Sequence, residues 1–167
     1  MCDRQPAPAQ PQEAAPSATP WWAAYPEPQS KPARISREEV LQMLKTKSLG
    51  ERDFILVDVR RNDFEGGTVQ GSINLPAQSL YPTIASVYTV FKAAGVKKAI
   101  FYCGSSSGRG PRSAAWLADH ISRVGDTTME SLILEGGIKG WVNAGPEYVE
   151  WMDGYNAEVW KKLDGGH

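Results

Sequence analysis

One cysteine and one arginine lie six residues apart in the stretch YCGSSSGRGPRSAAW, residues 102–116, and enclose small residues only. We name residues 103–109 the Cys–Arg loop; its interior is Gly104, Ser105, Ser106, Ser107 and Gly108. Small residues let successive backbone N–H groups point inward and bind an anion. The guanidinium of Arg109 can donate two hydrogen bonds to a tetrahedral oxyanion, and the thiolate of Cys103 is a nucleophile. The loop therefore predicts an oxyanion site in which Cys103 and Arg109 are catalytic and the interior residues bind substrate.

The segments on either side predict how this loop is held. KKAIFYC, residues 97–103, is a short apolar run that predicts a buried strand ending at the cysteine. The segment 110–123 contains good helix formers, and its early proline is tolerated in a first helical turn. Because a helix N-terminus carries positive potential, it favours both a bound anion and the thiolate form of Cys103. Ligands of α/β proteins bind at this kind of strand end.

The rest of the chain repeats the alternation of strand and helix. FILVDVR, residues 54–60, and SLILEGG, residues 131–137, predict two further buried strands, and a helical pattern covers 83–94. In SREEVLQMLK, Ser36 is predicted to cap a helix, with Glu39 completing a capping box. This alternation predicts an α/β fold with a central parallel sheet and helices on both faces.

We expect a single domain at residues 34–167, preceded by an arm at residues 1–33. A length of 167 residues is typical of one domain, and the Pro-, Ala- and Gln-rich arm cannot bury enough apolar surface to fold alone. Within the arm, PWWAAYPEP, residues 20–28, holds aromatic residues between prolines. This aromatic segment either docks on the domain or binds a partner in polyproline conformation.

Charge and cysteine content argue against several classes of protein. With 18 Lys and Arg against 19 Asp and Glu, the net charge is −1, so binding to nucleic acid or to an anionic membrane is not expected. We see no apolar run of the ~20 residues that a membrane helix needs and no signal pattern. Two distant cysteines form no disulfide framework, which favours a reducing compartment, the cytoplasm or the nucleus. Neither a metal site nor a cofactor is predicted.

Further charged residues near the loop are candidates for supporting roles. Asp58 and Arg60 end the first predicted strand and are interpreted as a structural ion pair; for Asp58 the alternatives are to orient the loop arginine or to act as a general acid. Asp63 and Glu65 lie on the following turn and are alternative acids. Arg112 either adds positive potential for a second acidic group of a substrate or is solvated. Packing or surface roles are predicted for Trp141, Trp151, Trp160 and His120.

Two longer segments resemble the rhodanese fold. In LVDVRRNDFEGGTVQGSINLPAQSL, residues 56–80, the resemblance is carried by Asp58, Arg60, Glu65, Gly71, Ile73, Asn74 and Pro76. LILEGGIKGW, residues 132–141, resembles the second rhodanese motif, through Gly136, Gly137 and Trp141. The resemblance covers roughly residues 35–145. It implies a rhodanese-like fold with the Cys–Arg loop as its active loop.

The length of the Cys–Arg loop narrows the resemblance. Sulfurtransferases that resemble rhodanese carry a loop one residue shorter, whereas M-phase inducer phosphatases and fungal arsenate reductases carry the length found here. The chain departs from these families at Tyr102 and Thr68, where many members have histidine, and at Gly104 and Gly108, where the phosphatases have acidic residues. Without an acid in the loop, we expect little help for poor leaving groups, so aryl phosphates should react better than alkyl phosphates.

These observations leave several functions open. The first is a cysteine phosphatase, acting on a phosphoprotein or a small aryl phosphate, in which Cys103 forms a phosphocysteine and Arg109 holds the oxygens. The second is an arsenate reductase that uses glutathione as co-substrate with glutaredoxin, since the only other cysteine, Cys2, lies in the arm. A thiosulfate sulfurtransferase and a non-enzymatic oxyanion-binding module remain further alternatives. For each of these functions we expect phosphate, arsenate or sulfate to bind in the Cys–Arg loop.

Overall fold

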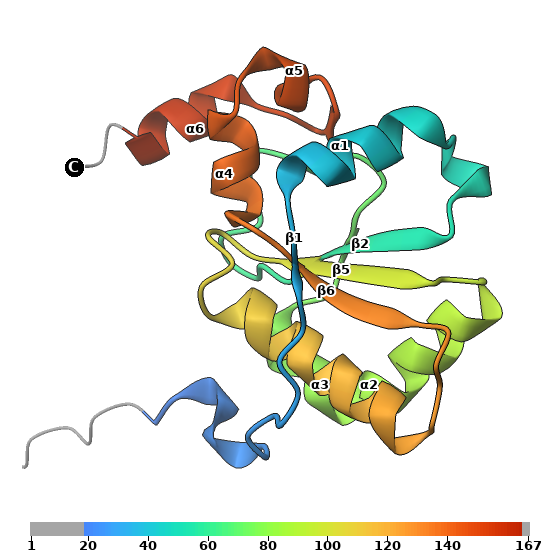
Figure 1. The fold of residues 1–167 in the computed structure, drawn as a ribbon. Helices are drawn as coiled ribbons and strands as arrows, with labels where there is room; N and C mark the ends of the chain where they lie inside the picture. Colours follow the sequence, from blue (N-terminus) through green and yellow to red (C-terminus); the bar gives the residue numbers. More distant parts are fainter. Residues whose placement is uncertain (1–18, 165–167) are drawn as a thin grey trace, which may run out of the picture.

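Five parallel strands form the centre of the molecule. The computed structural model describes residues 19–164, so Cys2 and His167 lie outside the described residues. The sheet has the order β1-β6-β5-β2-β4 and all its pairs are parallel (Figure 1). Its strands are β1 (Arg34–Ile35), β2 (Phe54–Asp58), β4 (Ile73–Asn74), β5 (Lys98–Tyr102) and β6 (Glu130–Leu134). The strand that precedes the Cys–Arg loop, β5, is thus the central one.

Helices cover both faces of the sheet. Figure 1 shows α1 and α4 on one face and α2 and α3 on the other. Their bounds are α1 (Arg37–Thr46), α2 (Ala77–Ala93), α3 (Arg109–Arg123) and α4 (Gly137–Asn143). The remaining elements are η1 (Trp21–Ala24), η2 (Leu49–Glu51), α5 (Pro146–Val149), α6 (Ala157–Asp164) and an antiparallel pair, β3 (Thr68–Val69) with β7 (Met152–Asp153). The predicted fold class is confirmed. Within residues 19–164, no helix is long and apolar enough to cross a membrane.

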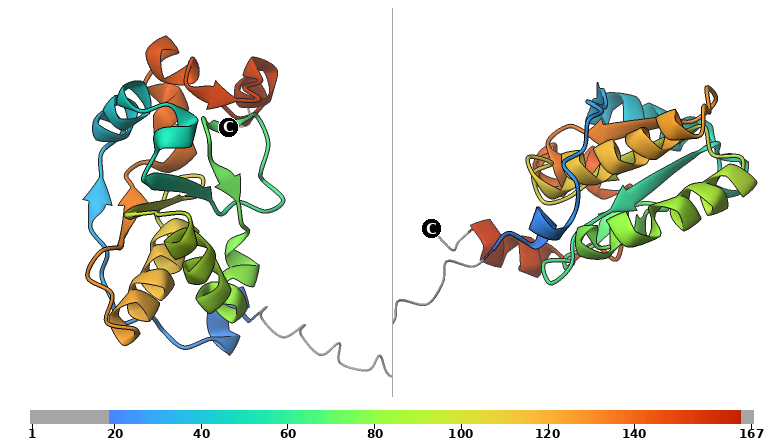
Figure 2. Two further views of the ribbon diagram at one scale, coloured as in Figure 1. Left: turned by 90° about the vertical axis from the view of Figure 1, so that its right-hand side faces the viewer. Right: turned by 90° about the horizontal axis from the view of Figure 1, so that it is seen from below.

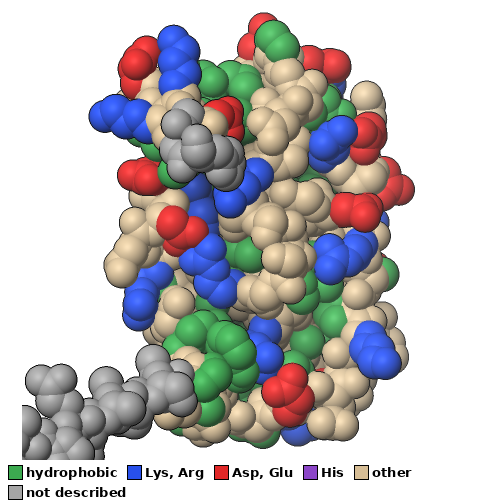
Figure 3. All heavy atoms as spheres, turned by 90° about the vertical axis from the view of Figure 1, so that its left-hand side faces the viewer, with side chains coloured by type: hydrophobic (Ala, Val, Ile, Leu, Met, Phe, Trp, Pro, Cys, Tyr) green, Lys and Arg blue, Asp and Glu red, His purple; other side chains and the backbone are tan. Residues whose placement is uncertain are grey.

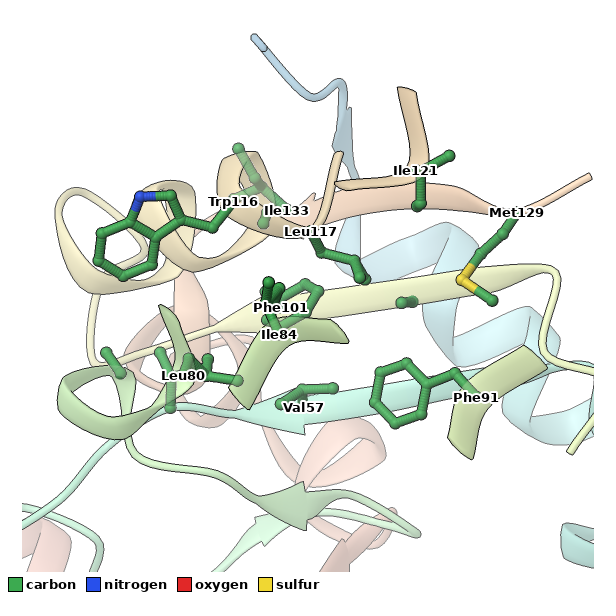
Figure 4. Close-up of a cluster of buried hydrophobic side chains, with 14 of the residues drawn as sticks. Val57, Leu80, Ile84, Phe91, Phe101, Trp116, Leu117, Ile121, Met129 and Ile133 are labelled. Carbon is green, nitrogen blue, oxygen red and sulfur yellow. The ribbon is translucent and has the colours of Figure 1, made fainter. Parts of the chain in front are cut away.

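Alternate residues of the central strands feed two separate cores. Val57 and Phe101 point toward α2 and α3, where they join a buried cluster (Figure 4). Their neighbours Leu56 and Ile100 point the other way and pack beneath α1 and α4. Strands buried on both faces need apolar residues at nearly every position. This is why the sequence shows continuous apolar runs there.

The start of α1 confirms the predicted capping box. The Ser36 hydroxyl accepts a hydrogen bond from the Glu39 amide at 3.2 Å, and the Ser36 amide donates to the Glu39 carboxylate at 3.4 Å. Val40, Leu41 and Leu44 then form the buried face of the helix. The cap therefore places the apolar stripe of α1 against the sheet from its first turn.

Several predicted boundaries were wrong. Helix α2 begins at Ala77 instead of residue 83, because Pro82 lies within the helix and does not end it. The strand predicted to reach residue 137 ends at Leu134. The following Gly136 and Gly137 have φ values of 80° and 60°, which turn the chain into α4.

The C-terminal elements pack on the loop that follows β2. Trp141 is fully buried and donates from Nε1 to the Tyr148 carbonyl at 2.7 Å. Trp160 in α6 is also buried and donates to the Gly66 carbonyl at 2.8 Å. Trp151 is partly buried against the same cluster. The predicted packing roles of these tryptophans are confirmed, and Trp160 links α6 to residues 63–67.

Candidate active site

The Cys–Arg loop leaves the central strand and enters α3 directly. Cys103 follows the last residue of β5 and is only 3% exposed. Its Sγ accepts a hydrogen bond from the backbone amide of Gly110, in the first turn of α3, at 3.3 Å. The N-terminus of a 15-residue helix thus lies against the sulfur. A helix dipole in this position stabilises negative charge on sulfur or on a bound anion.

The backbone amides in the interior of the Cys–Arg loop are left without acceptors among the described residues. Within the described part of the chain, none of the backbone N–H groups of residues 104–109 has a hydrogen-bond acceptor. Ser106 adopts a φ of 55°, a left-handed conformation rare outside glycine, and so bends the loop inward. Its buried hydroxyl accepts from the Cys103 amide at 3.4 Å, so it faces away from a substrate. Successive amides without acceptors in a tight loop are able to bind an anion.

The two other serines of the loop face the outside. The hydroxyls of Ser105 and Ser107 are hydrogen-bonded to each other at 2.7 Å. Both residues line the same pocket as Cys103. These are therefore the serine hydroxyls that can contact a substrate.

The beginning of α4 supports the loop from below. The amides of Ile138 and Lys139 donate to the carbonyls of Cys103 and Gly104, each at 3.0 Å. This close approach of α4 to the loop requires glycine at position 137, because a Cβ there would lie 2.5 Å from the Cys103 carbonyl oxygen. The carbonyls of Cys103 and Gly104 are thus bonded to α4, which fixes the first part of the loop.

Arg109 is paired with a carboxylate that lies 46 residues away in the chain. Its Nη1 and Nη2 donate to the two carboxylate oxygens of Asp63 at 2.7 and 2.6 Å. The hydrogen bonds from Arg109 lower the pKa of Asp63 from 3.8 to about 2, and those with Asp63 raise the pKa of Arg109. Asp63, predicted as an alternative acid, is therefore a carboxylate at neutral pH and orients Arg109.

Asp58 and Arg60 form a buried pair behind this contact. Arg60 donates from Nη2 to Asp58 at 2.8 Å, and the two side chains are 3% and 0% exposed. All five N–H groups of the guanidinium have acceptors, since Arg60 also bonds the carbonyls of Asp63, Glu65 and Gly67. Asp58 contacts Arg60 and Thr68 through its side chain, whereas Asp63 orients Arg109. Arg60 thus fixes the loop that presents Asp63, and the Glu65 side chain is exposed.

Two residues that depart from the family pattern contact each other. The Tyr102 hydroxyl lies 2.6 Å from the Thr68 hydroxyl and 2.7 Å from the Ser72 hydroxyl, and it accepts from the Val69 amide at 3.1 Å. Burial, and then the nearby charge of Asp58, raise the pKa of Tyr102. Tyr102 and Thr68 therefore form one buried, hydrogen-bonded unit next to Cys103.

A pocket of about 550 Å³ opens above the sulfur. The predicted site residues that line it are Cys103, Ser105, Ser107, Gly108, Arg109 and Arg112. Trp21, Trp22, Glu27 and Pro28 from the aromatic segment also line it, together with Pro111 and Ala115 from α3. Figure 3 shows this side of the molecule, with a hydrophobic patch where the described chain begins and basic side chains next to it. We name this cavity the Cys103 pocket.

The aromatic segment packs against the first half of α3 and the beginning of α2, and Figure 2 shows the start of the described chain beside these helices. The ring centroids of Trp21 and Tyr25 each lie 5.9 Å from that of Trp116. The Trp116 Nε1 donates to the Pro26 carbonyl at 3.1 Å. Further along, the Asp119 carboxylate accepts from the Gln29 and Ser30 amides at 3.0 and 2.8 Å. Residues 21–30 are thus held on the domain. The sequence alone did not predict that this segment lines the Cys103 pocket.

Arg112 connects the aromatic segment to α3. It donates to the Glu27 carboxylate at 3.1 Å, and its guanidinium lies 4.7 Å from the ring centroid of Trp22. Its side chain is 19% exposed. Arg112 therefore lies in the Cys103 pocket with its charge balanced by Glu27.

The chain from residue 36 to residue 144 matches a known family. The model of the rhodanese-like domain matches residues 36–144, so the chain belongs to the rhodanese-like domain family. Arsenical-resistance protein 2 of Saccharomyces cerevisiae is 31% identical over 97 residues, which cover 54% of this chain and 75% of that protein. M-phase inducer phosphatase 2 of the mouse is 29% identical over 128 residues, which cover 71% of this chain and 22% of that protein. The chain thus corresponds to about a fifth of the phosphatase.

Solved structures show the same fold. The As-Sb reductase from Leishmania major superposes with a TM-score of 0.67 at 21% identity, covering 81% of this chain and 97% of that one. A yeast protein tyrosine phosphatase of the rhodanese family has a TM-score of 0.63 at 23% identity, covering 79% and 99%. These likenesses show the fold, and the reaction has to be argued from the residues of the site itself.

Proposed function

We propose that this protein is a cysteine-dependent phosphatase. In the first step, the Cys103 thiolate attacks phosphorus, an S–P bond forms, and the P–O bond to the leaving group breaks. Water then attacks the phosphocysteine, which releases inorganic phosphate and regenerates the thiolate. The amides of residues 104–109 and the Arg109 guanidinium hold the three non-bridging oxygens in both steps. No metal or cofactor takes part in this proposal.

The observation that carries the proposal is a run of loop amides without acceptors among residues 19–164, next to a sulfur that lines an open pocket. The amides of residues 104–109 lack acceptors within the described chain, and Cys103 lines a pocket of about 550 Å³. A pocket of this size is within the ~300–1,000 Å³ typical of organic ligands. It therefore accepts a phosphate ester with an organic group, which favours a phosphatase.

The carboxylates near the site indicate which esters react. Asp63 is held as a carboxylate by Arg109, with a pKa of about 2, so it does not protonate a leaving group at neutral pH. Glu27 lines the pocket and is paired with Arg112. General acid catalysis raises a rate by about 10²–10⁴-fold. Without such an acid, esters with a phenol as leaving group lose little rate, whereas esters with an alcohol as leaving group lose much of it. We therefore expect aryl phosphates or phosphotyrosine to be substrates.

Phosphate release from phenyl phosphate and from a phosphotyrosine peptide tests this proposal. Wild-type protein should release phosphate, Cys103→Ser should not, and the matched variant of the chain's other cysteine, Cys2→Ser, should retain the activity. Arg109→Lys keeps the charge but loses the two-pronged geometry, so it should lose most of the activity. Wild-type protein without turnover on any phosphate ester would contradict the proposal.

A second function, arsenate reduction, is favoured by the 31% identity to Arsenical-resistance protein 2. There Cys103 would displace water from arsenate to form an S–As bond. Glutathione would then attack the Cys103 sulfur, the S–As electron pair would stay on arsenic as arsenite, and glutaredoxin would reduce the resulting mixed disulfide. Arsenite formation that requires glutathione and Cys103, without phosphate release, would establish this function. Thiocyanate formation from thiosulfate and cyanide would identify a sulfurtransferase. Oxyanion binding without any turnover would identify a binding module.

A further inference from the structure

The wall of the Cys103 pocket that faces α3 comes from outside the region matched to the family. Trp21, Trp22, Glu27 and Pro28 line the pocket together with Cys103, whereas the family match begins at residue 36. The aromatic segment therefore adds a surface to the oxyanion site that the rhodanese-like domain itself does not supply.

This wall has a defined position next to the site. One indole, that of Trp116, packs edge-on against both Trp21 and Tyr25 and also donates to the Pro26 carbonyl. A second, separate contact is made by Asp119, which accepts two backbone N–H groups further along the chain. Two independent attachments on α3, one on each side of residues 27–28, hold the wall in place before a ligand arrives.

Three of the four residues of this wall, Trp21, Trp22 and Pro28, are apolar, and the fourth, Glu27, is paired with Arg112. Trp22 is 37% exposed, one of the most exposed aromatic side chains of the described chain. Of the two arginines that line the pocket, Arg112 lies over the Trp22 ring and is paired with Glu27, whereas Arg109 belongs to the Cys–Arg loop. A substrate group in this place meets an indole and a balanced ion pair, so an uncharged group is preferred over a second anionic one.

We propose that Trp22 and its neighbours in the aromatic segment form the subsite that receives the leaving group of the substrate, and that the group they select is an aromatic ring. This inference rests on the proposed phosphatase function, since it places the ring on a phosphate held by the Cys–Arg loop. Aromatic rings pair favourably edge-to-face or offset, beyond the gain from burying their area. Trp22 is thus a specificity-determining residue, while the loop recognises the phosphate.

Binding of two phosphonates measures the subsite without any turnover. Phenylphosphonate and methylphosphonate present the same anion and differ in the ring, and neither is hydrolysed. Isothermal titration of the full chain should show that Trp22→Ala weakens phenylphosphonate binding by about 3- to 10-fold, the worth of one aromatic pair, and leaves methylphosphonate binding unchanged. Trp22→Phe should restore most of the loss.

The matched control is Tyr155→Ala. Tyr155 is 38% exposed, like Trp22, and does not line the Cys103 pocket, so its removal should change neither affinity. Equal affinity of the wild type for the two phosphonates, equal losses for both in Trp22→Ala, or no binding of either would overturn the proposal. If the ring preference is found but phenyl phosphate is not hydrolysed, the subsite stands as a binding site and the phosphatase function alone has failed.

Discussion

Replacing Gly137 by alanine should uncouple the Cys–Arg loop from α4. A Cβ at this position would lie 2.5 and 2.6 Å from the carbonyl oxygens of Cys103 and Gly104, which are backbone atoms and cannot rotate away. The φ of 60° also lies in the left-handed region. The loop or the helix must therefore move, and the hydrogen bonds from Ile138 and Lys139 to the loop carbonyls would be lost.

The expected loss of stability follows from these contacts. A left-handed conformation costs an L-residue about 1–2 kcal/mol, and two net hydrogen bonds contribute about 1–3 kcal/mol. The free energy of unfolding should thus fall by about 2–5 kcal/mol. Gly136→Ala is the matched control, because Gly136 also has a positive φ, of 80°, but its Cβ would meet nothing closer than 3.4 Å. It should lose only the conformational part, about 1–2 kcal/mol.

Urea unfolding followed by tryptophan fluorescence separates the two variants. The difference of about 1–3 kcal/mol corresponds to a midpoint lower by about 0.5–1.5 M for Gly137→Ala than for Gly136→Ala, at a slope of about 2 kcal/mol/M. Methylphosphonate affinity should fall in Gly137→Ala alone. Equal midpoints and equal affinities in the two variants would refute the claim that α4 positions the loop through Gly137.

Three further changes test other parts of the site. Because Arg109 lowers the pKa of Asp63 from 3.8 to about 2, their pair stabilises the protein near neutral pH, and this stability is lost as the pH falls from about 4 to 2. In Asp63→Asn the free energy of unfolding should therefore depend less on pH in that window. An unchanged pH dependence would contradict the pairing. Arg60→Met leaves the buried Asp58 charge unpaired and should cost about 3–5 kcal/mol in urea unfolding, whereas a cost below 1 kcal/mol, typical of an exposed pair, would argue against burial. Asp119→Ala removes one attachment of the aromatic segment, so limited proteolysis should cut residues 20–33 faster than in the wild type while the rest of the domain stays protected.

The sequence predicted the features that depend on short-range patterns. The strand before Cys103 and the capping box of Ser36 and Glu39 were found because apolar runs and capping signals act over a few residues. The α/β class follows from the order of such segments. The short strands β1 and β4 were missed, since two residues carry no periodicity and their pairing depends on the finished sheet.

Local sequence patterns did not predict which side chains pair across long distances in the chain. Asp63 was seen as an acid on a turn, but its contact with Arg109 depends on how Arg60 folds residues 63–67. Likewise, the composition of the aromatic segment sets it apart in the sequence. Its position beside Cys103, however, depends on contacts with Trp116, which follows the Cys–Arg loop in the chain. Such contacts are set by tertiary packing, and a local pattern contains no information on them.

The fully bonded guanidinium of Arg60 has a consequence for the speed of ligand capture. Because Arg60 binds the carbonyls of Asp63, Glu65 and Gly67 at once, the chain that presents Asp63 has little freedom to open and close. An adjustment of the Arg109 side chain toward an incoming oxyanion is then a rotation that takes picoseconds to nanoseconds, and it needs no loop motion of microseconds. Little backbone entropy is lost on capture, and association should approach the rate at which anions diffuse to the site.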